Sequence, residues 1–516
     1  MSKTMITSMR VRFFVFLCFL GGMLVSFHFS EIKYEAIRFH AKDYAFYLQF
    51  ASKLFDDGIE KVYSFNPNGD NCLFFSGTEG TDNFHQTIHF EPIKYFYAVL
   101  YAVFGTPKIL FFFISFVFFL PCLYSALLLP MRRKQCMYMA LFLSVLYILY
   151  PASILVPSYD LRPYIFLAPF FLLSFLSIAF SRSWREIALW FNVLFLAREE
   201  SLILGLVLLF YAVAKWRGEK PRHVKILLFS WLFWLGAIVI FVYWCGYPTK
   251  IFLAFSKFRI HNEIIFFAFF LVLCTIGMIL AAMPRFRRMF DKLGSHQHAL
   301  ETAPFVVLFI PLTYIFCRHE VYNIMSPSLD WLEKMFCSPR YFLYFVILLC
   351  FGIIVLQHNG RKIYKKVGSA VFFIICLFFF MINTVSPHGI FRSYSQYKNE
   401  LEAADKVWAI RNLTNKYETQ ILVDQDVYQV FCDYRYVYVY NRLPWHVIPG
   451  PGRFYPANSA VVQRLVDEHI EYVVASMSSY NIIDRFLAHN QLAGASLFTD
   501  SHYFGLRITS GPQKNR

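Results

Sequence analysis

Long apolar runs separated by short polar segments dominate the first three quarters of the chain. A helix that crosses a bilayer needs about 20 mostly apolar residues. The pair 187–197 and 201–214 is shorter, and we expect two helices that meet near one membrane face. The pattern predicts an α-helical multi-pass membrane protein with eleven spans: 13–29, 108–130, 136–157, 163–180, 187–197, 201–214, 225–245, 263–283, 303–317, 341–357 and 369–386.

Two segments are too long and too polar to be spans. Residues 30–107 form a first loop, which ends in the Tyr-rich stretch PIKYFYAVLYAVFG (92–105). That stretch is too short to span and predicts an interfacial or re-entrant helix. Residues 388–516 predict a C-terminal α/β domain with a largely parallel sheet. Its expected elements are a helix at 398–417, strands at 420–424 and 436–440, a helix at 458–469, a strand at 471–476, a helix at 479–490 and a strand at 503–509.

Composition and charge place the chain in a membrane and set its orientation. Hydrophobic residues make up 58% and charged residues 16%, against about 45–50% and about 25% in soluble chains. The net charge of +16 does not indicate nucleic acid, because residues 388–516 hold 13 basic and 12 acidic residues and the excess lies beside the apolar runs. With a cytoplasmic N-terminus, the inside loops hold 18 basic residues and the short outside loops hold 8. This bias predicts an external domain 388–516 after a membrane domain 1–387.

Charged residues beside apolar runs are the candidate site. Arg198, Glu199 and Glu200 interrupt two short apolar runs, and three such charges facing lipid would cost about 8–10 kcal/mol. They therefore line a polar cavity or pair with one another in a turn. Asp160 and Arg162 lie in the loop PSYDLRP (157–163). Asp160 is either functional or a helix cap, and Arg162 is suited to an anionic group.

The first loop supplies the remaining candidates. Asp43 precedes an amphipathic helical stretch and is either a functional acid or a helix cap. His85, His89 and Glu91 lie in FHQTIHFEP. On a helix, His85 and His89 would share a face at metal-ligand spacing, but Pro92 disfavours a helix at Glu91, and the pattern favours loop histidines or a histidine near an anionic substrate. All these groups fall on one side of the predicted membrane, which favours one external cavity for a substrate that is part lipid and part sugar phosphate.

The order of these features resembles the GT-C superfamily of polyprenyl-phosphate-sugar-dependent glycosyltransferases, and most closely an uncharacterised bacterial membrane-protein family related to it. The resemblance implies that Asp43 is the first-loop acid near the acceptor, and that HFEPI (89–93) is the segment before the interfacial helix. It implies a second-loop acid at Asp160, with Arg162 where relatives have histidine. Arg198-Glu199-Glu200 resembles a Lys-Glu-Asp cluster, and SPRYFLY (338–344), with Arg340 and Tyr341, is a weaker match.

The resemblance implies transfer of a sugar, with inversion, from a polyprenyl-phosphate donor to an acceptor outside a bacterial inner membrane. A carboxylate would deprotonate the acceptor hydroxyl. Arg162, Arg198, Arg340 or a divalent metal at His85 and His89 would stabilise the leaving phosphate. Two alternatives remain: a transporter or flippase for a lipid-linked or anionic solute, and a non-catalytic membrane scaffold that presents the C-terminal domain.

Overall fold

The protein is seen in a computed structural model, and part of the chain is described below. The described residues are 3–38, 47–48, 50–52, 54–55, 90–128, 134–158, 161–216, 219–244, 301–305, 342–343, 345–350, 352–354, 377, 380–381, 383–384, 390–424, 426–434, 436–440, 470–489 and 493–509.

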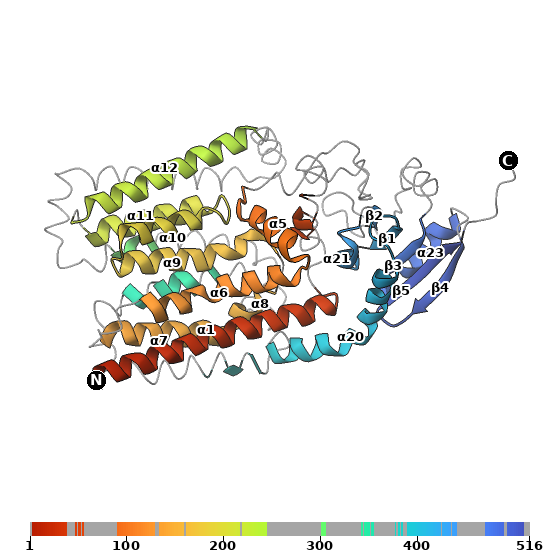
Figure 1. The fold of residues 1–516 in the computed structure, drawn as a ribbon, viewed down its shortest axis with the longest axis horizontal. Coiled ribbons are helices and arrows are strands. Elements are labelled where there is room, and N and C mark those ends of the chain that lie inside the picture. Colours follow the sequence, from red (N-terminus) through yellow and green to blue (C-terminus); the bar gives the residue numbers. More distant parts are fainter. Residues whose placement is uncertain are drawn as a thin grey trace, which may run out of the picture.

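The described helices of the first half lie side by side in a bundle (Figure 1). Pro151 and the short η1 turn interrupt two of the expected spans, so each begins or ends in a separate short helix. The expected interfacial helix is α5. In chain order the elements are α1 Lys3–Glu35, α5 Ile93–Phe104, α6 Lys108–Leu128, α7 Lys134–Leu149, α8 Ala152–Leu155, η1 Pro163–Phe166, α9 Leu167–Ala179, α10 Trp184–Leu194, α11 Ser201–Trp216 and α12 Pro221–Trp244.

Three of the described helices are long and apolar enough to cross a membrane: Ser8–Glu35 within α1, Lys108–Leu127 within α6 and Pro221–Phe241 within α12. Shorter apolar helices, including α9 and α11, pack between them. Most of the expected spans 263–283, 303–317 and 369–386 lie outside the described residues. The count of eleven spans therefore stays a prediction.

A close approach between α1 and α6 organises the bundle. The ring of Phe119 lies against Gly22, and a Cβ at that glycine would come within 2.3 Å of a ring carbon. Nearby, Ser26 and Ser115 share a buried hydrogen bond of 3.1 Å. Small residues and paired hydroxyls at a helix contact are typical of helix packing in membranes.

The C-terminal region is an α/β domain with a five-stranded sheet of order β2-β1-β3-β5-β4. β1 pairs in parallel with β2 and β3, whereas β5 pairs antiparallel with β3 and β4. The expectation of a largely parallel sheet is correct for the first three strands and wrong for the last two. The elements are α20 Ile390–Leu413, β1 Gln420–Asp424, α21 Tyr428–Phe431, β2 Tyr436–Tyr440, β3 Tyr472–Ser476, η3 Met477–Ser479, α23 Tyr480–His489, β4 Ala493–Thr499 and β5 Tyr503–Thr509.

The sheet lies between two helices, because the strand residues alternate between its faces. Ile421 and Val423 pack in the core that also holds Val407 of α20 and the helices of the bundle. Leu422, between them, packs in a second core with Ile483 of α23. One face of the sheet therefore shares a continuous core with the bundle, and the other face is covered by α23.

The α/β domain docks on the end of α1 (Figure 1). The Arg38 guanidinium donates to both carboxylate oxygens of Glu400 on α20, at 2.5 and 2.8 Å. The Trp408 indole donates to the Glu35 carbonyl at 2.9 Å, and its ring lies 5.0 Å from that of Tyr34. We call the end of the bundle where α1 ends and α20 contacts it the domain end.

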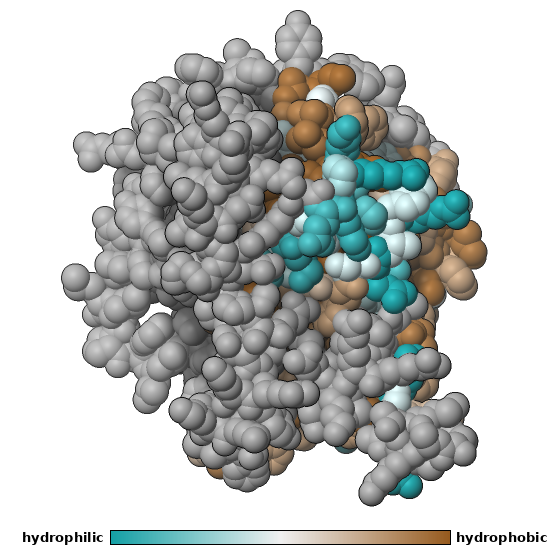
Figure 2. All heavy atoms as spheres, turned by 90° about the vertical axis from the view of Figure 1, so that its left-hand side faces the viewer, coloured by the Kyte–Doolittle hydropathy of each residue, from teal (hydrophilic) through white to brown (hydrophobic). Residues whose placement is uncertain are grey.

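The opposite end of the bundle carries tryptophans and basic side chains. The guanidinium groups of Arg185 and Arg222 lie 5.5 and 5.2 Å from the ring of Trp184. Lys220 lies 5.7 Å from the ring of Trp216. Figure 2 views this end and shows hydrophilic residues gathered among hydrophobic ones. Tryptophans with lysines and arginines are typical of the cytoplasmic membrane interface.

Candidate functional site

The candidate site lies at the domain end, where the start of α5 meets the turn between α10 and α11. The amide of Ile93 donates to the carbonyl of Leu196 at 3.0 Å. The amide of Phe90 donates to the carboxylate of Glu199 at 2.9 Å. The turn forms because the apolar run of α10 ends before Arg198, and α11 begins directly after Glu200. Two segments about a hundred residues apart in the sequence are thereby joined.

Arg198 lies among three carboxylates, and with them and Tyr47 it forms what we call the Arg198 cluster. Its Nε lies 3.0 Å from Glu200, 3.7 Å from Glu91 and 3.8 Å from Glu199. The Glu91 side chain is fully buried, and it accepts a hydrogen bond of 2.7 Å from the Tyr47 hydroxyl. The cluster brings together the predicted residues Glu91, Arg198, Glu199 and Glu200. A turn whose charges pair only with each other does not account for Glu91.

The surroundings in the cluster raise the pKa of both Arg198 and Glu199, for different reasons. Burial alone would lower the Arg198 pKa, but the carboxylates of Glu200, Glu91 and Glu199 outweigh it and raise that pKa. Burial raises the pKa of Glu199, although Arg198 and the Phe90 amide oppose this effect. A raised pKa means that these surroundings favour the neutral form of the Glu199 carboxyl more than water does.

Sequence reasoning missed two members of this region, Tyr47 and Lys94. Lys94 is 2% exposed, and its ammonium lies 5.3 Å from the Phe50 ring and 5.8 Å from the Tyr95 ring. Burial raises the Glu199 pKa, and the Lys94 charge is one of the contributions that oppose this rise. The available signal was a lysine inside the otherwise apolar stretch PIKYFYAV.

A second contact joins the end of α1 to the loop that carries Asp160 and Arg162. The buried ammonium of Lys33 donates to the Ser158 carbonyl at 2.8 Å. Arg162 precedes η1, and its guanidinium lies 5.9 Å from the Tyr164 ring. Lys33 is a further cation at the domain end that the sequence pattern did not single out.

Several predicted site residues lie outside the described residues: Asp43, His85, His89, Asp160, Arg340 and Tyr341. Their roles stay predictions. Among the described residues, no group of three or more His, Cys, Asp or Glu side chains is arranged to hold a metal ion. The acids of the Arg198 cluster surround an arginine instead, and the predicted metal depends on His85 and His89.

Comparison with known proteins gives one family match. Residues 61–258 match a family described as "Predicted membrane protein (DUF2079)". The match supports the expected resemblance to an uncharacterised membrane-protein family, and it contains Glu91 and the Arg198-Glu199-Glu200 segment. No curated protein matches the chain. Among solved structures, the chain is similar to the apo oligosaccharyltransferase of Archaeoglobus fulgidus, with 11% identity, a TM-score of 0.30 and coverage of 96% of this chain and 75% of that one.

Proposed function

We propose that this chain, similar over residues 61–258 to a family of predicted membrane proteins, is a membrane glycosyltransferase. It transfers a sugar, with inversion, from a polyprenyl-phosphate-linked donor to an acceptor outside the cell membrane. The Arg198 cluster is the observation that supports this proposal. It holds a buried arginine among carboxylates at the domain end of an apolar bundle. A lipid phosphate reaching from the bilayer would meet it there.

The cations of the site stabilise the leaving phosphate. A guanidinium matches phosphate oxygens with two parallel hydrogen bonds, which suits Arg198, and Lys94 adds a second positive charge close by. Stabilising charge that develops on a leaving group is the largest single contribution in many enzymes. Glu91 and Tyr47 act through Arg198, because Glu91 is fully buried and holds the guanidinium in place. They are positioning residues in this proposal.

The acids of the site handle the acceptor. Asp43 is the proposed base that removes the proton from the acceptor hydroxyl. Glu199, whose pKa is raised by burial, shares this role or orients the acceptor, together with Glu200 and Asp160. Arg162, His89, Arg340 and Tyr341 contact the substrates, and a divalent metal bound by His85 and His89 is part of the same proposal.

The orientation of the bundle supports an external reaction. The domain end holds the proposed site, and the opposite end holds the Trp184 and Trp216 rings with their basic partners. By the positive-inside rule that opposite end faces the cytoplasm. The α/β domain then lies outside, beside the site, where it can present an acceptor.

The test is sugar transfer in proteoliposomes from a panel of polyprenyl-phosphate donors that carry a labelled hexose or pentose. Wild type should transfer label, and Asp43→Asn should lose about 10²–10⁴-fold in rate, the usual contribution of a general base. Glu199→Gln should also lose transfer. The matched control is Arg182→Gln, which breaks an arginine–glutamate pair of 2.9 Å at the opposite end of α10.

The controls separate a chemical effect from a folding defect. Arg182→Gln should retain the wild-type rate, because Arg182 and its partner Glu186 lie at the far end of α10 from Arg198. Equal transfer by wild type and Asp43→Asn would remove Asp43 as the base. If wild type moved no sugar from any donor and instead carried the intact lipid across the bilayer, the protein would be a flippase.

A further inference from the structure

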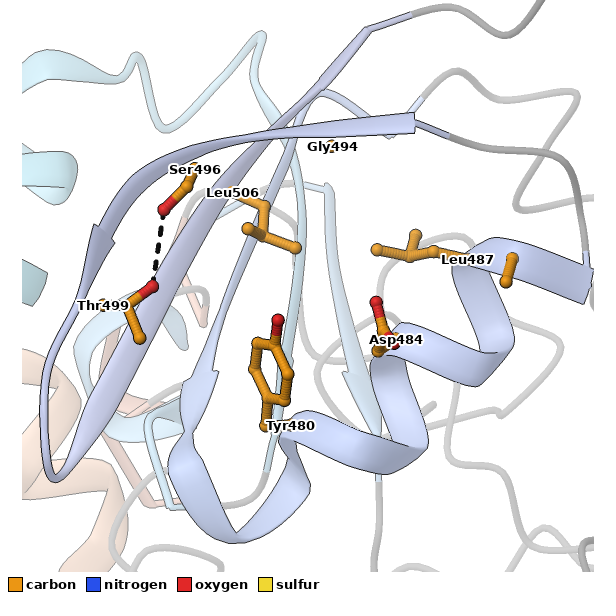
Figure 3. Close-up of a pocket in the computed structure, with 8 residues that line it drawn as sticks. Tyr480, Asp484, Leu487, Gly494, Ser496, Thr499 and Leu506 are labelled. Carbon is orange, nitrogen blue, oxygen red and sulfur yellow. Dashed lines mark hydrogen bonds between the residues drawn. The ribbon is translucent and has the colours of Figure 1, made fainter.

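A small pocket opens on the face of the sheet that is covered by α23 (Figure 3). It lies between α23 and the hairpin of β4 and β5 and has a volume of 220 Å³. Ligand pockets for drug-sized molecules measure about 300–1,000 Å³, so this pocket is suited to a single ring. The opposite face of the sheet packs against α20 and the bundle core, and the pocket is therefore separate from the Arg198 cluster.

The pocket combines polar walls with an apolar floor. Tyr480 and Asp484 line it from α23, and Figure 3 shows the tyrosine hydroxyl and the carboxylate directed into the space between helix and hairpin. Ser496 and Thr499 line it from β4, with their hydroxyls 3.4 Å apart. Leu506 of β5 provides an apolar surface between the two walls.

The hairpin has a bulge and a glycine beside the pocket. A bulge in β4 inserts Leu497 between Ser496, which pairs with Leu506, and Phe498, which pairs with Gly505. Bulges redirect side chains at sheet edges and near binding sites. Gly494 also lines the pocket, and a Cβ there would lie 3.2 Å from the Leu506 side chain. A larger residue at Gly494 would therefore project into the pocket.

At the edge of the sheet where many α/β folds bind ligands, a buried carboxylate bonds to the protein itself. That edge is the switch point beyond the carboxyl ends of β1 and β3. Asp424, at the end of β1, is fully buried there. It accepts hydrogen bonds from the Ser476 amide and hydroxyl, the Ser479 hydroxyl and the amides of Asp426 and Val427. This carboxylate holds the ends of β1 and β3 together, and the α23 pocket lies elsewhere in the domain, between α23, β4 and β5.

We infer that the α23 pocket binds one neutral sugar unit of a glycan. A sugar ring presents hydroxyls at its rim and C–H groups on its faces, which complement the polar walls and Leu506. The Asp484 carboxylate accepts from sugar hydroxyls in strong charge-assisted hydrogen bonds. The residues described as lining the pocket include this acid and no lysine or arginine, which disfavours phosphate and other anions. The inference goes beyond sugar transfer and does not depend on it.

The test is saturation-transfer-difference NMR on the full chain in lipid nanodiscs. The probes are glucose, galactose, mannose and N-acetylglucosamine, each at millimolar concentration. At least one of them should receive saturation from the protein. Asp484→Asn should weaken its binding about tenfold, the effect of losing a hydrogen bond to a charged group. Gly494→Val should abolish it by filling the pocket.

Further variants separate this site from the proposed catalytic one. Glu199→Gln, which should lose sugar transfer, should bind the free sugar as wild type does. Ser496 is exposed, so Ser496→Ala should fold normally and should weaken sugar binding. This variant tests the pocket even if Gly494→Val fails to fold. The inference is overturned if none of the four sugars receives saturation. It is also overturned if the signal persists in both Gly494→Val and Asp484→Asn, or is lost in Glu199→Gln alone.

Discussion

The pairing of Glu91 with Arg198 predicts a measurable coupling free energy. The Glu91 carboxylate is fully buried and lies 3.7 Å from the Arg198 guanidinium. At an effective dielectric constant of about 20, two unit charges at that separation of 3.7 Å attract by about 4.5 kcal/mol. Removing one partner of a buried pair usually costs about 3–5 kcal/mol. Arg198→Gln should therefore destabilise the protein by about that amount.

Protonation of Glu91 limits the part of this loss that comes from its unpaired buried charge. A buried carboxylate that has lost its arginine can take up a proton instead, and for an ordinary glutamate this costs about 3.7 kcal/mol at pH 7. Glu91→Gln should cost less than Arg198→Gln, because Arg198 keeps Glu200 at 3.0 Å. The double variant Glu91→Gln/Arg198→Gln should lose less stability than the sum of the two single losses, and the difference should be about 2–4 kcal/mol.

The assay is reversible unfolding in mixed detergent micelles, followed by far-ultraviolet circular dichroism, for wild type, both single variants and the double variant. Tyr47→Phe, which removes the 2.7 Å hydrogen bond to Glu91, should cost about 1.5–3 kcal/mol. A coupling below about 0.5 kcal/mol is the range of independent sites. That result would refute the reasoning, since it would mean that Glu91 and Arg198 do not depend on each other for their charge balance.

Two further predictions concern packing and pH. Gly22→Ala should destabilise the protein by about 1–3 kcal/mol through overpacking against Phe119, whereas Gly21→Ala, with no atom within 4 Å of the added Cβ, should be nearly silent in the same unfolding assay; equal effects would contradict the close contact. Burial would raise the Asp433 pKa, but the Arg411 hydrogen bonds and charge lower it. The stability that Asp433 contributes should be present above about pH 4 and lost as pH falls through its depressed pKa. The free energies of unfolding of wild type and Asp433→Asn, measured from pH 7 to pH 3, should differ less as the pH falls. A difference that grew with acid would contradict the lowered Asp433 pKa.

The sequence predicted the described helices well, because an apolar run in a bilayer must satisfy its backbone hydrogen bonds internally and therefore forms a helix. α6 and α12 follow their expected spans closely, and β1 and β2 match their expected bounds. β4 was missed because AGASLFT is an exposed edge strand whose small residues give little hydrophobic alternation. Without β4, nothing in the sequence pattern indicated the β4–β5 hairpin, and the antiparallel pairing of β5 was therefore not predicted.

The site was predicted as a set of residues and not as a geometry. Arg198 was identified because a charge beside an apolar run is costly, and Glu91 because it follows two histidines in FHQTIHFEP. Their direct pairing depends on how α5 meets the turn after α10, and a single sequence holds no signal for a contact between residues so far apart in the chain. Tyr47 and Lys94 were missed for a related reason, since a tyrosine or lysine in an amphipathic stretch is ordinary until its burial is known.

The docking of the α/β domain on α1 also determines how long the end of α1 lacks its contacts during synthesis. Arg38 and Glu400, joined by two hydrogen bonds, are 362 positions apart in the chain. At about 5–20 residues per second, Arg38 waits roughly 20–70 s for its partner. α1 therefore obtains its contacts with Glu400 and Trp408 only after α20 has been made. A chain that stops before α20 leaves the Arg38 guanidinium and the Tyr34 ring without Glu400 and Trp408. The polar and aromatic groups at the end of α1 therefore stay uncovered until the C-terminal domain packs on them.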